Sequence, residues 1–416
     1  MAATIYLATT ANGGSDSNDG LTTGTPKATF RQAIFAVDDG GTIEVIDSGT
    51  HSPSDSFANR AIVDRNVNVV VSSGQTPTLD GTAAFLAGRP GFASGGAYTL
   101  TFTGFTFENW GAGSTAYIVS QTGNLTLQYS QCIFKAIGSV SLFQQPPVAT
   151  SGTPNKLDRC RIESTVESKI FNSVPGGDWY FLVQNSLFEY GGTDSGNVYI
   201  DTNSNSHVNA IVRNCSFLVE VDNTTGTSNG VIRCGTVENT IIKNTSTGGS
   251  YTTLAAIKAI SAYSNNCVNG NFAVTQVNTG GTDGGGLVTD DPLFTNEASS
   301  PVDFELQSGS PCIDAGKTIA AVTVDYAGTS RPQGSAYDIG AYEFASGGGG
   351  GSFTPDDGDE TYGTKFSSSF TIRGTANKLA TRRFNSAKDN RQAPFSVSVS
   401  GPATIRRRTT PYKSET

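Results

Sequence analysis

A four-residue phrase recurs at an almost constant interval, and this repeat constrains the fold more than any other feature. Five clear copies and a weaker sixth are Gln131-Cys132-Ile133-Phe134, Arg159-Cys160-Arg161-Ile162, Asn185-Ser186-Leu187-Phe188, Asn214-Cys215-Ser216-Phe217, Asn239-Thr240-Ile241-Ile242 and Asn266-Cys267-Val268-Asn269. Measured at the second residue, they are 28, 26, 29, 25 and 27 residues apart. An earlier copy without the cysteine, Phe105-Thr106-Phe107-Glu108, places Phe107 27 residues before Phe134. A period of this length is typical of a solenoid.

The side chains of the phrase fit a β-strand. Its second and fourth residues would point to the same face of a strand. The second residue is small in the clear copies and the fourth is Phe or Ile, so stacked copies would bury a column of small groups beside a column of large ones. Asn, the first residue in four of the six copies, tolerates the left-handed conformation of tight turns. The sequence therefore predicts an all-β chain folded as a parallel β-helix, because a β-sandwich would not keep one phrase at one period.

The repeat also explains the cysteines. Cys132, Cys160, Cys215 and Cys267 fall on the small-residue position, where a buried cysteine acts as a small hydrophobic group. Only Cys132 and Cys160 would lie on neighbouring turns, ~4.8 Å apart and within reach of a disulfide. We expect reduced thiols, because no secretion signal is recognised. The sequence has no CxxC pair and only two histidines, so we expect neither a metal site nor a cofactor.

Three motifs follow one another at the N-terminus. They are the alternating strand Ile5-Tyr6-Leu7, the turn Asn18-Asp19-Gly20-Leu21-Thr22 and a short amphipathic helix that begins near Thr29. In this order they resemble the N-terminal cap of the right-handed parallel β-helix proteins of the pectate-lyase-like superfamily. The resemblance implies a helix that plugs the first turn, where apolar core and unpaired strand edges would otherwise be exposed.

A second group of motifs lies near the C-terminus. In chain order these are Asp291-Pro292-Leu293-Phe294, Asp303-Phe304-Glu305-Leu306, Ser310-Pro311-Cys312-Ile313-Asp314-Ala315-Gly316, Arg331-Pro332 and Asp338-Ile339-Gly340-Ala341-Tyr342-Glu343. They look like the closing module of surface β-helices that is called a choice-of-anchor domain. The resemblance implies a fold and a way of closing it, and no activity.

The charge is divided between two parts of the chain. Residues 1–363 contain 16 Lys+Arg and 34 Asp+Glu, a net charge of −18, whereas residues 364–416 contain 11 and 2, a net charge of +9. We expect the basic tail to bind an acidic partner, with a solvated tail as the alternative. The candidate partner-binding residues are Arg382, Arg383, Arg406, Arg407 and Arg408. The acidic body does not favour nucleic acid as a partner.

No apolar run approaches the ~18 residues of a membrane span, and no signal peptide is recognised, so we expect no membrane partner. A surface β-helix without an export signal resembles the tailspikes, fibres and capsid decoration proteins of bacteriophages, which are assembled in the host cytoplasm. The resemblance implies a location in the virion, a homotrimer, and attachment to other virion proteins through residues 352–416. It adds a surface glycan as a second partner.

The candidate catalytic residues are acids. Glu163 and Glu189 occupy equivalent positions one turn apart, and Asp178 precedes Trp179, an aromatic side chain that could stack on a sugar and so bind carbohydrate. Glycoside hydrolysis uses two carboxylates on one face, ~5–9.5 Å apart. Acids on a solenoid can equally be solvated surface residues. The sequence lacks the paired Asp, Gly-His-Gly and Arg-x-Lys motifs of polygalacturonases.

Three hypotheses for the function remain open. The favoured one is a structural or receptor-binding virion surface protein, and the alternatives are a polysaccharide depolymerase (lyase or glycoside hydrolase) and a bacterial cell-surface adhesin. We expect five segments: an N-terminal cap and first coil (residues 1–45), β-helix coils (46–285), a C-terminal closing module (286–346), a glycine-rich and acidic linker (347–363) and a basic anchoring tail (364–416).

Overall fold

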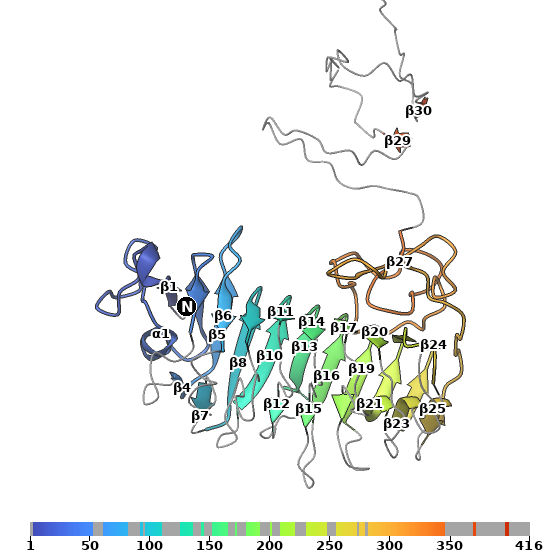
Figure 1. The fold of residues 1–416 in the computed structure, drawn as a ribbon. Helices are drawn as coiled ribbons and strands as arrows, with labels where there is room; N and C mark the ends of the chain where they lie inside the picture. Colours follow the sequence, from blue (N-terminus) through green and yellow to red (C-terminus); the bar gives the residue numbers. More distant parts are fainter. Residues whose placement is uncertain are drawn as a thin grey trace, which may run out of the picture. The chain divides into compact units, whose positions relative to one another are not determined.

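The computed structural model describes most of the chain in segments. These are residues 3–52, 61–81, 92–94, 96–109, 125–135, 143–144, 152–164, 171–172, 180–191, 200–201, 209–220, 230–247, 255–272, 274–278, 282–345, 369–371 and 396–398. They fall into two compact units, Met1–Phe344 and Ala345–Thr416. The first unit is a parallel β-helix, as the repeat predicts (Figure 1).

Sheet A forms the longest wall of the helix, with one strand from each successive turn. Its strands pair in parallel in the order β1 (Thr4–Leu7), β2 (Gly41–Val45), β5 (Val67–Val71), β8 (Tyr98–Thr103), β10 (Leu125–Ser130), β13 (Asn155–Asp158), β16 (Phe181–Gln184), β19 (Ala210–Arg213), β21 (Gly230–Glu238) and β23 (Ala255–Ser264). This row ends with β26 (Thr282–Asp283), which pairs with the C-terminal half of β23. A second row joins the N-terminal halves of β21 and β23, and consists of β12 (Phe143–Gln144), β15 (Phe171–Asn172), β18 (Ile200–Asp201) and β25 (Val274–Asn278). Nearby, β4 (Ala61–Val63) pairs with β7 (Phe92–Ser94).

Sheet B forms a second wall, which follows sheet A after a short turn, and carries the repeated phrase. Its nine described strands are β3 (Thr50–His51), β6 (Thr78–Asp80), β9 (Thr106–Glu108), β11 (Ile133–Lys135), β14 (Arg161–Ser164), β17 (Leu187–Gly191), β20 (Ser216–Glu220), β22 (Ile241–Asn244) and β24 (Cys267–Gly270). Phe107 pairs with Phe134, which confirms the expected 27-residue offset.

From β8 onwards, one left-handed residue makes each turn from sheet A into sheet B. Gly104 has a φ of 85° at the first of these turns, and φ angles of 47° to 53° occur at Gln131, Arg159, Asn185, Asn214, Asn239 and Asn265. Asn adopts this conformation more readily than most residues. The first position of the phrase is therefore confirmed as a turn residue, except in the sixth copy.

The sixth copy, as the sequence suggests it, is out of register by one residue. The turn residue is Asn265, and Cys267 pairs with Ile241 rather than with Thr240. The inward position belongs to Asn266, whose Nδ2 donates to the Val237 carbonyl at 3.0 Å and whose side-chain oxygen accepts from the Thr240 N–H at 3.0 Å. The prediction that Cys267 shares the inward column of small residues is wrong, because either of two consecutive asparagines could have been the turn residue.

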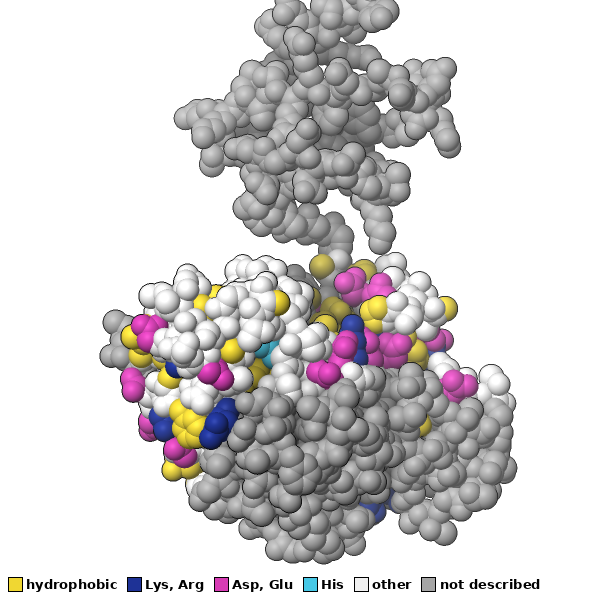
Figure 2. Space-filling model, turned by 60° about the vertical axis from the view of Figure 1, so that its left-hand side comes forward, with side chains coloured by type: hydrophobic (Ala, Val, Ile, Leu, Met, Phe, Trp, Pro, Cys, Tyr) yellow, Lys and Arg dark blue, Asp and Glu magenta, His cyan; other side chains and the backbone are white. Residues whose placement is uncertain are grey.

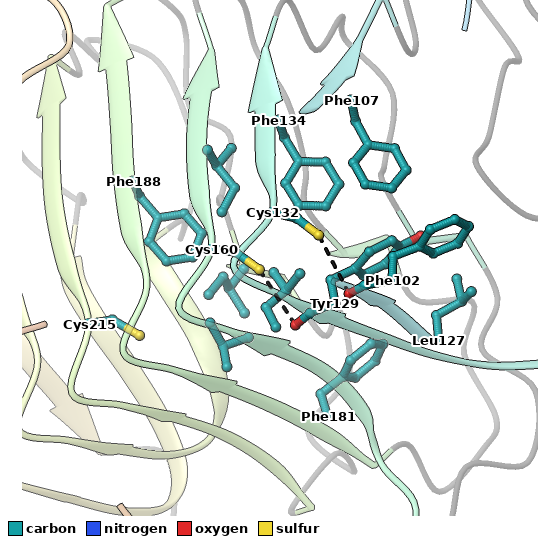
Figure 3. Close-up of a cluster of buried hydrophobic side chains, with 14 of the residues drawn as sticks. Phe102, Phe107, Leu127, Tyr129, Cys132, Phe134, Cys160, Phe181, Phe188 and Cys215 are labelled. Atoms are coloured by element: carbon teal, nitrogen blue, oxygen red, sulfur yellow. Dashed lines mark hydrogen bonds between the residues drawn. The ribbon is translucent and has the colours of Figure 1, made fainter. Parts of the chain in front are cut away.

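The core consists of ladders of like side chains. Phe107 and Phe134 stack with ring centroids 4.8 Å apart, and Phe188 and Phe217 stack at 4.1 Å. Figure 3 shows the thiols of Cys132 and Cys160 beside this ladder, where they donate to the carbonyls of Phe102 and Tyr129 at 3.6 and 3.5 Å. Burial raises the pKa of Cys160 well above its ordinary value. Side chains from neighbouring turns thus pack together and fill the core.

The N-terminal cap consists of β1, the 3₁₀ helix η1 (Thr10–Asn12) and α1 (Phe30–Ala36). The Thr29 side chain accepts a hydrogen bond from Gln32 N–H, so the helix begins where the sequence predicts. Phe30 is 1% exposed and meets His51 and Phe102 edge-on, with ring centroids 6.0 and 6.5 Å apart. This packing makes α1 a plug for the first turns of the core.

Asp47 joins the cap to the first turn of the helix. One oxygen accepts from Thr9 N–H at 2.8 Å, Thr9 Oγ1 at 2.6 Å and Asn12 Nδ2 at 2.9 Å, and the other lies 2.7 Å from His51 Nε2. Burial works to raise the pKa of Asp47, but the hydrogen bonds from Thr9, Asn12 and His51 outweigh it and lower the pKa to about 2.

We expect Asp47→Asn to weaken the cap at neutral pH. Because the folded pKa lies below the unfolded value of 3.8, this carboxylate stabilises the fold above pH 4, and the contribution disappears between pH 4 and 2. Urea unfolding should therefore show a deficit of about 1–2 kcal/mol at pH 7 that shrinks towards pH 2. Asp290→Asn, at an exposed carboxylate, is the matched control. A deficit that does not change with pH would contradict the role of the charge.

The expected closing module folds over the outer face of sheet B. Figure 1 shows β27 (Phe294–Asn296) above the last strands of that sheet, and β27 pairs with β28 (Asp303–Leu306) in antiparallel fashion. Outward side chains of the sheet and apolar side chains of the module form one buried cluster: Leu187, Leu218, Ile241, Cys267, Phe294, Val302, Phe304, Leu306, Cys312, Ile339 and Ala341. The module therefore has its own apolar contact with the solenoid.

Four charged residues of the C-terminal segment, Asp325, Arg331, Asp338 and Glu343, are buried inside this module. Arg331 and Glu343 form an ion pair of 2.5 Å with both side chains 0% exposed, and Arg331 Nη2 donates to the Gly340 carbonyl at 2.9 Å. Asp325 accepts from Glu343 N–H at 3.0 Å, and Asp338 accepts from Asp314 N–H at 2.7 Å. Burial raises the pKa of Asp338 to about 6. The motif is thus a polar core that holds irregular backbone in place.

The second unit contains β29 (Ser369–Thr371) and β30 (Ser396–Ser398), which pair in parallel with Ser369 opposite Ser396.

Candidate functional site

A column of charged residues runs along the outer face of sheet B. We call it the charged column: Asp80, Glu108, Lys135, Glu163 and Glu189, one from each of β6, β9, β11, β14 and β17. Each follows a buried residue of the inward ladder, and strand alternation therefore turns it outwards. Figure 2 shows acidic side chains gathered on the described surface, with basic ones among them. This column is where the sequence hypotheses about catalysis can be examined.

Glu163 and Glu189 are opposite each other on adjacent strands, which confirms that they are equivalent positions one turn apart. Both bind Arg161: its Nε lies 2.8 Å from Glu163 Oε1, and its Nη2 lies 2.6 Å from Glu189 Oε2. The Arg161 side chain is only 9% exposed, and the two acids are 26% and 23% exposed. Arg161 stands in the neighbouring outward column, where Leu187 is its partner on β17.

Arg161 and Glu189 also bind the closing module. Arg161 Nη2 donates to the Val302 carbonyl at 3.1 Å, although the two residues are 141 positions apart, and Val302 N–H donates to Glu189 Oε2 at 3.1 Å. The Arg161 guanidinium also lies 5.6 Å from the ring centroid of Phe304. The acid pair and Arg161 thus form an ionic clasp, and we use this name for Arg161, Glu163, Glu189 and the Val302 backbone.

The chemistry of the clasp differs from that of a glycosidase pair. In such enzymes one carboxyl group gives a proton to the leaving oxygen while the other faces the sugar or a water molecule. Here both carboxylates point at one guanidinium, and one of them also accepts a backbone N–H of the module. The arrangement is suited to fixing a module on a sheet.

A second pair of acids lies further along the charged column. Asp80 and Glu108 are opposite each other on β6 and β9 and are both partly exposed. Asp80 is the last residue of its strand and accepts from Asn109 Nδ2 at 3.0 Å. In the sequence, both acids directly follow a residue of the inward ladder, and this position predicts that they face outwards. The pair was missed because the repeated four-residue phrase is incomplete in these early turns.

The other predicted site residues cannot be placed. Asp178, Trp179, Arg382, Arg383 and Arg406–Arg408 lie outside the described residues. Within the described ranges, no group of three or more His, Cys, Asp or Glu side chains is arranged to hold a metal ion. No helix of the described part is long and apolar enough to cross a membrane.

Comparisons with known proteins add little about activity. No family model matches the chain, and no curated protein matches its sequence. Among solved structures, the crystal structure of pectate lyase Pel9A matches with a TM-score of 0.36 and 14% sequence identity, over 82% of this chain and 96% of that chain. The parallel β-helix fold of this chain follows from the strand pairing described above.

Proposed function

We propose that this chain is a structural surface protein: a rigid β-helix displayed on a larger particle, such as a bacteriophage virion, through residues 352–416. The observation that carries the proposal is the ionic clasp. The best acid pair of the sequence serves to fix the closing module on the solenoid. Each turn of the solenoid is hydrogen-bonded to its neighbours, and the closing module is bound to sheet B. Such a rigid body is suited to display a receptor-binding surface.

The division of charge supports attachment through the tail. The second unit is separate from the β-helix and contains the candidate partner-binding arginines. Attraction between a basic tail and an acidic partner would speed association and weaken as salt rises. In the proposal, other virion proteins provide that acidic surface, and a surface glycan or host receptor binds the solenoid. The resemblance to tailspikes implies that the protein is a homotrimer on the particle.

Co-sedimentation with intact particles tests the attachment. Full-length protein should sediment with the particles, a chain that ends at Gly347 should not, and raising the salt concentration should release the full-length protein. A variant with Lys in place of Arg406, Arg407 and Arg408 keeps the positive charge and should still bind the particles. A variant with Glu at the same three positions should not bind. Equal binding of the full-length and truncated chains, or of the Lys and Glu variants, would sink the proposal.

A depolymerase remains the second candidate because Asp80 and Glu108 are a partly exposed acid pair on one face. A cleavage assay on a panel of acidic and neutral capsular polysaccharides decides between the structural role and the depolymerase. Hydrolysis is detected by new reducing ends, and lyase activity by the absorbance of unsaturated uronates. We expect no product from the wild-type protein. Product that is lost in Glu108→Gln but kept in Glu163→Gln would establish the enzyme and overturn the structural role.

A further inference from the structure

Two cysteines from distant parts of the chain meet beneath the closing module. Cys267 is the first residue of β24, where it faces outwards from sheet B, and Cys312 lies in the module. Both are 0% exposed and belong to the cluster that joins the module to the sheet. Both are free thiols in this structure.

The two thiols are neighbours within that buried cluster. A hydrogen bond with the Cys267 side chain is the largest influence that raises the pKa of Cys312 above its ordinary value, ahead of burial. The backbone of Cys312 is fixed on both sides, since its N–H donates to Ser310 Oγ at 3.2 Å and its carbonyl accepts from Ile339 N–H at 3.0 Å. Cys267 Sγ also lies 3.5 Å from the Asp290 carbonyl.

This pair differs from the other adjacent pair, Cys132 and Cys160. Those two are neighbours in one parallel sheet, where Cβ atoms that point the same way keep the strand spacing of ~4.8 Å. A side-chain hydrogen bond joins those two thiols as well, but a disulfide needs Cβ atoms about 3.5–4.5 Å apart, and closing this pair would require two hydrogen-bonded turns to move together. Cys267 and Cys312 face each other across the contact between a strand and an irregular loop, so the pairing of two strands does not set their Cβ spacing.

We propose that Cys267 and Cys312 form a disulfide that fastens the closing module to the last strand of sheet B when the chain meets a disulfide oxidant such as oxidised glutathione. The thiolate of Cys312 attacks one sulfur of the oxidant, which gives a mixed disulfide and releases one glutathione thiolate. The thiolate of Cys267 then attacks the Cys312 sulfur and releases the second. The two protons of the cysteines end on the two reduced glutathione molecules. Because both thiols are buried, the reaction occurs while the module docks or opens.

Thiol counting and peptide mapping of the full-length chain test the proposal. The chain is refolded with reduced glutathione alone or with an excess of oxidised glutathione, and thiols are then counted in denaturant. The reduced sample should titrate all six cysteines, and the oxidised sample two fewer. Mapping needs a glutamyl endopeptidase besides trypsin, because no Lys or Arg separates the two cysteines, whereas Glu297 and Glu305 do. The expected cross-linked peptides contain Cys267 and Cys312.

Two matched variants identify the pair independently of the peptide map. Each variant has five thiols when reduced. Oxidation should leave all five in Cys312→Ser, whereas it should leave three in Cys160→Ser. Six thiols in the oxidised wild-type protein, or a cross-link between Cys132 and Cys160, would overturn the proposal. The wild-type peptide map stands even if a serine variant folds poorly.

Discussion

Replacing Arg331 by leucine is expected to release the closing module from sheet B while the β-helix stays folded. Arg331 and Glu343 are both fully buried, so the substitution leaves the Glu343 carboxylate without its partner in the interior. Breaking a buried ion pair on one side typically costs about 3–5 kcal/mol. The loss is concentrated in the module because Gln333 N–H and Asp338 N–H also donate to Glu343.

Hydrogen exchange locates this loss. The backbone amides of Ile339 and Gly340, which donate to Cys312 and Asn239, should lose protection in Arg331→Leu, whereas those of β10 and β13 should keep it. The double variant Arg331→Leu with Glu343→Leu removes both charges and should recover much of the stability. Loss of protection in the module and in β10 to the same extent would show that the two fold as one unit and contradict the expectation.

The repeat made the β-helix predictable because its signal is local. A small residue, a large residue two positions later and a turn residue before them recur in each copy, and strand alternation fixes which side chains point inwards. Thr29 as the start of α1 followed from capping chemistry in the same way. The failure at Asn265 and Asn266 marks the limit of this reasoning, since either residue satisfies the turn and only the paired register decides.

The candidate site depended on contacts that no local pattern encodes. The equivalence of Glu163 and Glu189 follows from the period, but their common partner Arg161 and its contact with Val302 do not. An acid pair on a solenoid face is the same in sequence whether it faces a substrate or a folded-back module. The C-terminal motif shows the same limit, because its charged residues read as surface groups until the chain around them is folded.

Truncating Phe134 to alanine is expected to cost about 3–5 kcal/mol. Phe134 is 0% exposed, stacks on Phe107 and meets Tyr129 edge-on with ring centroids 5.3 Å apart. Its strand, β11, is hydrogen-bonded to β9 on one side and β14 on the other, so the backbone cannot close the cavity. The loss in the free energy of unfolding should therefore lie at the upper end of this range.

Urea unfolding of Phe134→Ala beside Ile162→Val separates this effect from a general loss of apolar volume. Ile162 follows Phe134 in the same inward ladder, and its truncation removes one methyl group, for about 0.5–1.5 kcal/mol. In a solenoid each turn is stabilised by its neighbours, so a large defect at β11 should uncouple the turns on its two sides and broaden the transition. A Phe134→Ala transition as sharp as that of the wild-type protein and shifted by less than the Ile162→Val transition would mean that the aromatic ladder does not hold the turns together. In that case the backbone hydrogen bonds of sheets A and B alone would have to account for the rigidity on which a display role depends.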